Sequence, residues 1–174
     1  MKIVFPFSFL LLLIYFLLGC KQKSKQVSEY SHSNIFSFLE LTETDSIYIV
    51  ARFSECGEWG GHKEEIIIDA DQNRNIYAHH KIYPYNCDSL KFYYANDNLK
   101  PKRNTTVTLT DKGKQSVRDY IQRMAQSKTN ETFPGHAGNY FSIITSDSAL
   151  IIKVYDNKQD DIDSYNKLVS ELFK

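Results

Sequence analysis

The chain has 174 residues, of which 21 are basic and 21 are acidic. This neutral balance gives no electrostatic basis for a general nucleic-acid binder, which carries an excess of Lys and Arg. Aromatic residues make up 14 % of the chain, and this content argues against a disordered protein, because disordered chains contain few aromatic residues. Residues 34–174 are sufficient for one globular domain with its own core.

The first twenty residues have the pattern of a bacterial export signal. Lys2 supplies a charged region, residues 3–19 are predominantly apolar, and the segment ends with Leu17-Leu18-Gly19-Cys20. This ending resembles the lipobox of bacterial lipoproteins, in which diacylglyceryl is attached to the cysteine and a peptidase cuts just before it. The resemblance implies a signal peptide over residues 1–19 and lipidation of Cys20.

An uncut transmembrane anchor is the alternative for this segment. Residues 3–19 would span roughly 26 Å as a helix, which is short for a bilayer. Lys21, Lys23 and Lys25 follow the segment, and such a flank favours a cytoplasmic position for what comes next. A plain anchor gives no reason for the Gly19-Cys20 pair, so we expect the lipoprotein. Because residue 21 is not Asp, the resemblance implies the outer membrane, facing the periplasm.

The remaining cysteines fit an exported domain. Residues 20–33 are polar and rich in Lys, Ser and Gln, and they indicate a flexible tether. After Cys20 only Cys56 and Cys87 remain, and an even pair in an exported domain predicts a disulfide. Two free buried thiols or two metal ligands are the alternatives.

Four segments predict an antiparallel β-meander. Ser46 to Phe53 and Ile76 to Tyr85 alternate between apolar and other residues, as strands with one buried face do. Glu64 to Ala70 contains a short apolar run typical of a central strand, and Leu90 to Tyr94 is expected to add a fourth strand. The first and third strands would end at the same end of the sheet, where both cysteines lie.

Helices and a hairpin complete the predicted fold. Residues 34–41 suggest a short helix, and Thr110 is a suitable N-cap for a longer helix with one apolar face. Tyr140 to Thr145 and Ala149 to Asp156 predict a hairpin, and a last helix is expected from Asp160. The fold class is therefore α+β, with the meander and the hairpin in one sheet and two main helices packed on one face.

The loop from Cys56 to His62 is the strongest candidate for a site. Its three glycines permit close backbone approach. Trp59, the only tryptophan, lies beside Glu58, and an exposed Trp in a cystine-held loop can contact a partner. The alternative is a wide turn whose Trp caps the core. The candidate binding residues are Glu58, Trp59, His62 and His136.

Metal and catalytic motifs are not found in the sequence. There is no H-E-x-x-H and no paired C-x-x-C of the kind that binds zinc, and no G-x-S-x-G of a serine hydrolase. His79 and His80 are adjacent, so on a strand they face opposite sides. His80 has apolar neighbours on its own face, which indicates a hydrogen-bonded core or rim histidine. We expect neither metal nor cofactor.

A basic stretch runs from Leu99 to Lys128, with eight basic residues against Asp111 and Asp119. On a lipoprotein it could face anionic lipid or polysaccharide. The alternative is a solvated helix face together with the loop before it.

The run R-F-S-E-C-G-E-W-G-G-H and the later N-C-D, within Ile47 to Leu90, resemble uncharacterised small lipoproteins of Bacteroidota. That resemblance implies no activity. We expect a membrane-anchored envelope lipoprotein with a non-enzymatic domain, which binds an envelope protein or an anionic envelope component. The alternative is a small acid/base or metal-dependent enzyme centred on Glu58, His62 and His136.

Overall fold

The computed structural model describes residues 41–56, 61–84, 87, 100–131, 138–156 and 158–174. The chain divides into two units, Met1–Asn34 and Ile35–Lys174, and the described residues all belong to the second. The expected signal peptide and tether lie outside the described residues. The expected short helix over 34–41 also lies outside them, apart from Leu41, which is in no helix.

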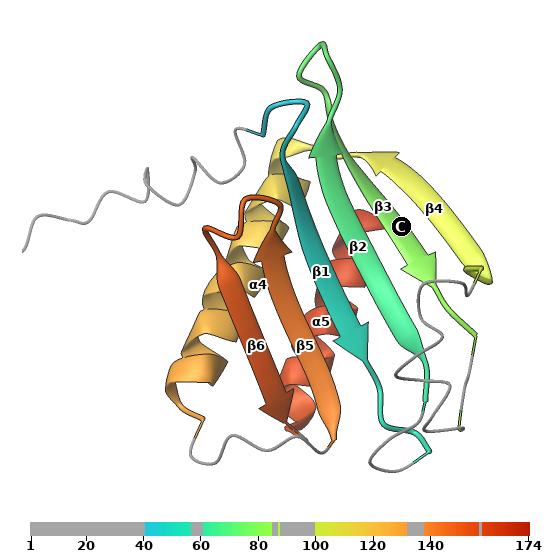
Figure 1. Ribbon diagram of the computed structural model, residues 1–174, viewed down its shortest axis with the longest axis vertical. Coiled ribbons are helices and arrows are strands. Elements are labelled where there is room, and N and C mark those ends of the chain that lie inside the picture. Colours follow the sequence, from blue (N-terminus) through green and yellow to red (C-terminus); the bar gives the residue numbers. More distant parts are fainter. Residues whose placement is uncertain (1–40, 57–60, 85–86, 88–99, 132–137, 157) are drawn as a thin grey trace, which may run out of the picture. The chain divides into compact units, whose positions relative to one another are not determined.

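The domain contains one antiparallel sheet whose strand order is β4-β3-β2-β1-β5-β6 (Figure 1). The first four strands form the meander and the last two form the hairpin, so the predicted α+β class is confirmed. The strands are β1 (Ser46–Arg52), β2 (Lys63–Ala70), β3 (Ile76–Ile82), β4 (Arg103–Thr108), β5 (Asn139–Thr145) and β6 (Ile151–Asp156).

The strand β4 was not predicted. The expected strand from Leu90 to Tyr94 lies outside the described residues. The segment that pairs with β3 is Arg103–Thr108, part of the basic stretch expected to form the loop before the helix. Its residues are mostly exposed, so the segment has no apolar alternation that would reveal a strand. Its three threonines are β-branched and suit an edge strand.

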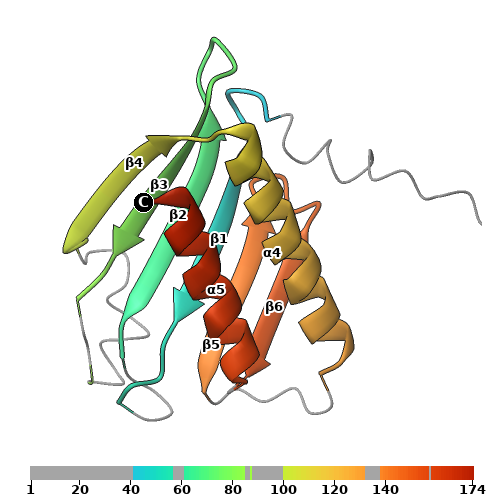
Figure 2. The ribbon, with the colours of Figure 1, turned by 180° about the vertical axis from the view of Figure 1, so that it is seen from behind.

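Helices α4 (Asp111–Thr129) and α5 (Gln159–Leu172) lie on the same face of the sheet and pack against each other (Figure 2). The predicted cap is confirmed, because the Thr110 hydroxyl accepts a hydrogen bond from the Gly113 amide at 3.1 Å. Within the described part of the chain, no helix is long and apolar enough to span a membrane.

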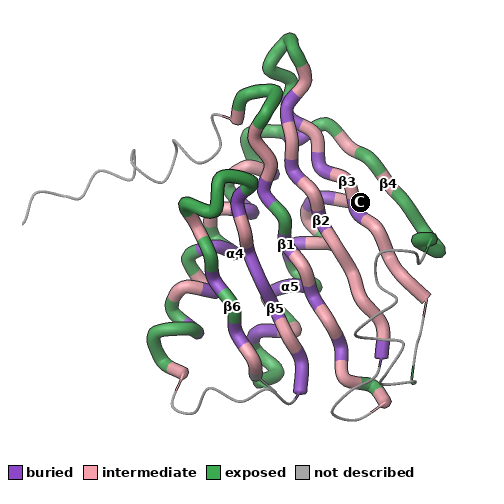
Figure 3. Tube along the Cα trace, viewed as in Figure 1, coloured by how far each residue is buried: buried purple, intermediate pink, exposed green. Residues whose placement is uncertain are grey.

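The core lies between the sheet and the two helices. Along β1, and along β2 from Ile66 onward, every second residue is buried, as Figure 3 shows by alternating colours. The helices add Val117 and Met124 from α4 and Tyr165 and Leu168 from α5, each no more than 2 % exposed. The opposite face of the sheet is covered by none of the described helices (Figures 1 and 2).

Candidate functional site

The predicted disulfide is present at the base of the loop that follows β1. Cys56 and Cys87 are bonded, with their Cα atoms 5.4 Å apart. Of the four candidate binding residues, only His62 is described, because Glu58, Trp59 and His136 lie outside the described residues.

His62 is held between two carboxylates. Its Nδ1 atom is 2.6 Å from Oε1 of Glu55, and its Nε2 atom is 3.2 Å from Oε1 of Glu64. The His62 amide also donates to Oε2 of Glu55 at 2.9 Å, and the ring stacks on Phe53 with centroids 4.6 Å apart. The pKa of His62 is raised, chiefly by the hydrogen bond to Glu64. The imidazolium form therefore donates from both nitrogens.

Glu64 is the centre of this cluster. Besides His62, it accepts hydrogen bonds from Nε2 of His80 at 2.8 Å and from the hydroxyl of Tyr165 at 3.2 Å. Its side chain is only 15 % exposed. Burial raises the pKa of Glu64, but the hydrogen bonds from His62 and His80 outweigh burial and lower that pKa to about 2. Glu64 is thus an ionised carboxylate under the helices, with donors from three separate parts of the chain.

The two buried donors to Glu64, His80 and Tyr165, are held in these hydrogen bonds by their surroundings. His80 is 4 % exposed, which confirms the predicted hydrogen-bonded core histidine, and the ring of Phe173 lies 5.0 Å from its ring. Burial and then the charge of Glu64 raise the pKa of Tyr165 well above its usual value. Tyr165 therefore remains protonated and donates to Glu64.

Gly61 allows the segment before β2 to lie close to Phe53 at the end of β1. Its φ is +155°, and a Cβ atom at this position would lie 1.8 Å from the carbonyl oxygen of Phe53. The next residue completes the closure, because the Phe53 amide donates to the carbonyl of His62 at 3.0 Å. A residue with a side chain would force these two segments apart.

We name the side chains of Glu55, His62, Glu64, His80 and Tyr165 the carboxylate cluster. Sequence reasoning selected His62 but missed Glu64, although strand alternation was a usable signal. Glu64 is on the same face of β2 as Ile66 and Ile68, so the alternation of this strand already directs the Glu64 carboxylate toward the core. The described residues contain no group of three His, Cys, Asp or Glu side chains placed to hold a metal ion.

Three of the five basic residues of α4 lie near acidic partners. Lys114 is 3.1 Å from Asp111, Arg123 is 3.4 Å from Asp160, and Lys128 pairs with Glu131. These pairs reduce the net positive charge along the helix. They favour the interpretation of this stretch as a solvated helix face.

The uncovered face of the sheet has a distinct apolar feature. The strand register places Tyr48 of β1 between Ile67 of β2 and Ile144 of β5, and it places Ile144 beside Ile151 of β6. We call these four side chains the apolar row. They come from four neighbouring strands, and Tyr48 and Ile151 are 36 % and 55 % exposed.

Aromatic and cationic side chains lie on the same face, four residues further along these strands from the apolar row. The rings of Tyr140 and Tyr155 lie 4.7 Å apart, and the Arg52 guanidinium lies 5.4 Å from the Tyr140 ring. Further along, Nζ of Lys63 is 4.9 Å from the Tyr83 ring. This end of the uncovered face therefore carries aromatic side chains with cationic neighbours.

Comparison of the chain with protein-family models, with curated proteins and with solved structures finds no match in any of the three.

Proposed function

We propose that the protein is a bacterial envelope lipoprotein, anchored by lipid on Cys20, whose domain binds an envelope protein and catalyses no reaction of its own. The anchor is supported by the run Leu17-Leu18-Gly19-Cys20 after an apolar segment. The disulfide between Cys56 and Cys87 adds support, because such bonds persist in oxidising compartments such as the periplasm. The outer membrane is the proposed location.

The apolar row is the observation that carries the binding role. A protein interface has an apolar centre enriched in aromatic residues, and a polar rim surrounds it. Ile151 and Tyr48 are exposed in the apolar row, and tyrosines with cationic neighbours lie four residues further along the same strands. Tyrosine is favoured at binding surfaces because it buries a large area with few rotatable bonds.

The charges of this face favour a protein over an anionic polymer. Lys63 lies 3.8 Å from Glu65, and His79 lies 3.1 Å from Asp69, so both signs are present on this face. A surface for anionic lipid or polysaccharide needs a single-sign basic field. Mixed charge around an apolar centre fits a folded protein partner.

The non-catalytic role is supported by the carboxylate cluster. A general base needs a free lone pair directed at the substrate. Both ring nitrogens of His62 lie within hydrogen-bonding distance of carboxylates, and Glu64 already accepts from three donors. In this arrangement the cluster holds the end of β1, the start of β2 and α5 together.

The anchor is tested by the intact mass of the purified protein. We expect loss of residues 1–19 and the added mass of acyl chains on Cys20, and Cys20→Ser should prevent both changes. A membrane-bound protein that retains residues 1–19 would refute the lipoprotein.

The binding role is tested by crosslinking in cells, with a photoreactive amino acid placed at Ile151. We expect one discrete adduct with another protein, and Tyr48→Asp should abolish it while leaving the unfolding temperature nearly unchanged. The matched control places the same amino acid at the exposed Gln122 of α4, on the helical side of the domain, and should give no such adduct. Equal adducts at both positions, or none at Ile151, would contradict the proposal. An adduct of twice the protein's mass would mean that a second copy is the partner.

A further inference from the structure

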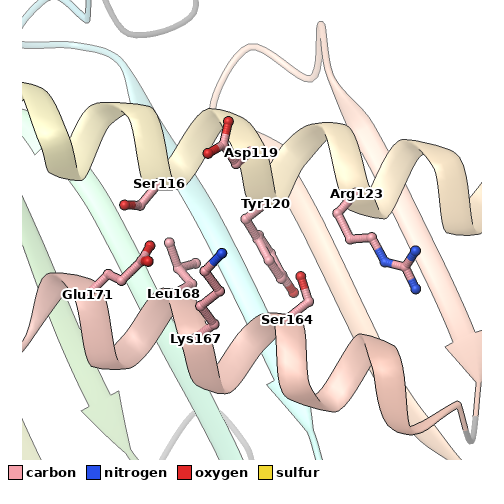
Figure 4. Close-up of a pocket in the computed structure, with 8 residues that line it drawn as sticks. All are labelled: Ser116, Asp119, Tyr120, Arg123, Ser164, Lys167, Leu168 and Glu171. Atoms are coloured by element: carbon pink, nitrogen blue, oxygen red, sulfur yellow. The ribbon is translucent and has the colours of Figure 1, made fainter.

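A cavity of about 240 Å³ lies between α4 and α5 on the side of the helices that faces away from the proposed binding face (Figure 4). Its lining includes Tyr120 and Ser116 from α4 and Leu168 from α5, all of them buried. The neighbouring Asp119, Arg123, Lys167 and Glu171 add charged groups of both signs. The cavity therefore combines a buried floor with a charged rim.

The Tyr120 hydroxyl is the unusual part of this cavity. Tyr120 is 2 % exposed, and its hydroxyl has no hydrogen-bond partner among the described residues. Figure 4 shows its hydroxyl end beside Ser164, between the two helices. Burial, followed by the charge of Asp161, raises the pKa of Tyr120, so the hydroxyl keeps its proton. Since buried polar groups are normally hydrogen-bonded, this donor is suited to an acceptor brought by a ligand.

The cavity is elongated between α4 and α5, and we call it the groove. The charged residues of its rim are separated along its length. Figure 4 shows Glu171 beside Ser116 at one end and Arg123 at the other, with the Lys167 amino group between them. Among the described residues, Lys167 and Glu171 have no ion-pair partner. Arg123 is 3.4 Å from Asp160 and from Asp161, and its guanidinium retains further donors. One end of the groove thus suits an ammonium group and the other a carboxylate.

The dimensions set the size of the ligand. From Ser116 to Arg123 the helix rises about 10 Å. A peptide of two or three residues is roughly 7–11 Å long when extended. Its two charged ends would therefore reach the two ends of the groove, and its side chains would contact Leu168.

We propose that this groove binds a short peptide with free ends. The peptide's ammonium group lies at Glu171, and its carboxylate accepts from Arg123 and from the Tyr120 hydroxyl. Lys167 contacts a peptide carbonyl between them. The site is independent of the proposed binding face and of the anchor.

The test uses the full lipidated protein in detergent, with trialanine as the probe and calorimetry as the measurement. We expect trialanine with free ends to bind, and trialanine with an acetylated amino end and an amidated carboxyl end to bind at least 10-fold more weakly. Tyr120→Phe should weaken binding roughly 3- to 10-fold, as loss of one hydrogen bond does. It should not lower the unfolding temperature, because the hydroxyl has no described partner to lose.

A second pair of variants separates charge from packing. Glu171→Gln should weaken binding of the free peptide, whereas Asp163→Asn, on the same helix but outside the groove, should leave it unchanged. The proposal is overturned if trialanine fails to bind at millimolar concentration, or if the capped and free peptides bind equally. It is also overturned if Tyr120→Phe and Glu171→Gln leave the affinity unchanged. None of these results bears on crosslinking from the opposite face.

Discussion

Replacing Glu64 by Gln should remove most of the stabilisation that the carboxylate cluster provides. The pKa of Glu64 is lowered from 4.5 to about 2 in the folded protein. A shift of about 2.5 units corresponds to about 3 kcal/mol of unfolding free energy, at 1.36 kcal/mol per unit. Because the folded pKa is depressed, this stabilisation is complete above pH 4.5 and is lost as the pH falls toward 2. Glu64→Gln should therefore be less stable than the native protein by about 3 kcal/mol at neutral pH, and the two should converge in acid.

The measurement is urea-induced unfolding at neutral pH and at several acidic values. The matched control is Glu65→Gln, because Glu65 is the next residue, its side chain is equally exposed at 15 %, and it points to the uncovered face. Glu65 accepts one hydrogen bond, from Tyr83 at 2.9 Å, so its loss should cost roughly 1 kcal/mol. If the two variants lose the same stability, or if the loss at Glu64 does not diminish in acid, the argument from the lowered pKa is wrong.

Three further predictions concern the same part of the domain. The pKa of His62 is raised in the folded protein, so protonated His62 stabilises the fold. This stabilisation is complete below the ordinary pKa of 6.5 and is lost as the pH rises through the raised pKa. The free energy of unfolding should therefore fall on the alkaline side, and His62→Gln should flatten that fall. A native profile that is already flat there would contradict this. Gly61→Ala should cost more than roughly 2 kcal/mol, because the Cβ would meet a carbonyl oxygen at 1.8 Å; thermal unfolding checks it, and an unchanged midpoint would refute it. Reducing the Cys56–Cys87 bond should lower stability by roughly 3–4 kcal/mol; unfolding with and without reductant measures this, and equal curves would count against it.

The sequence was most informative where apolar spacing determines which side of a strand is buried. The meander, the hairpin and the helix capped by Thr110 follow from periodicity and capping chemistry, and the structure has all of them. The meander also placed Cys56 and Cys87 at one end of the sheet, because three strands that alternate in direction return the chain to the same end. For the meander, the hairpin and the capped helix, the pattern of apolar residues within each segment agrees with the topology of the whole sheet.

The carboxylate cluster could not be assembled from the sequence because it depends on register. His80 lies opposite Ile66 in the strand pairing, two residues from Glu64 along β2. Tyr165 reaches Glu64 from a helix that is 101 residues away in the chain. Spacing within a segment predicts which way each side chain points, but not which side chains from separate segments meet.

The composition of β4 determines how the described sheet ends. Its residues Arg103 to Thr108 contain a single aliphatic residue, Val107, and its polar side chains are mostly exposed. Threonine favours extended backbone without adding an apolar surface, and a charged residue at an edge opposes pairing with another chain. Lipid anchors would concentrate many copies of this domain in one plane, where exposed edges meet often. If the domain is anchored by lipid as proposed, an edge of this composition would oppose strand-to-strand aggregation in such a crowded layer and leave the apolar row for the proposed partner.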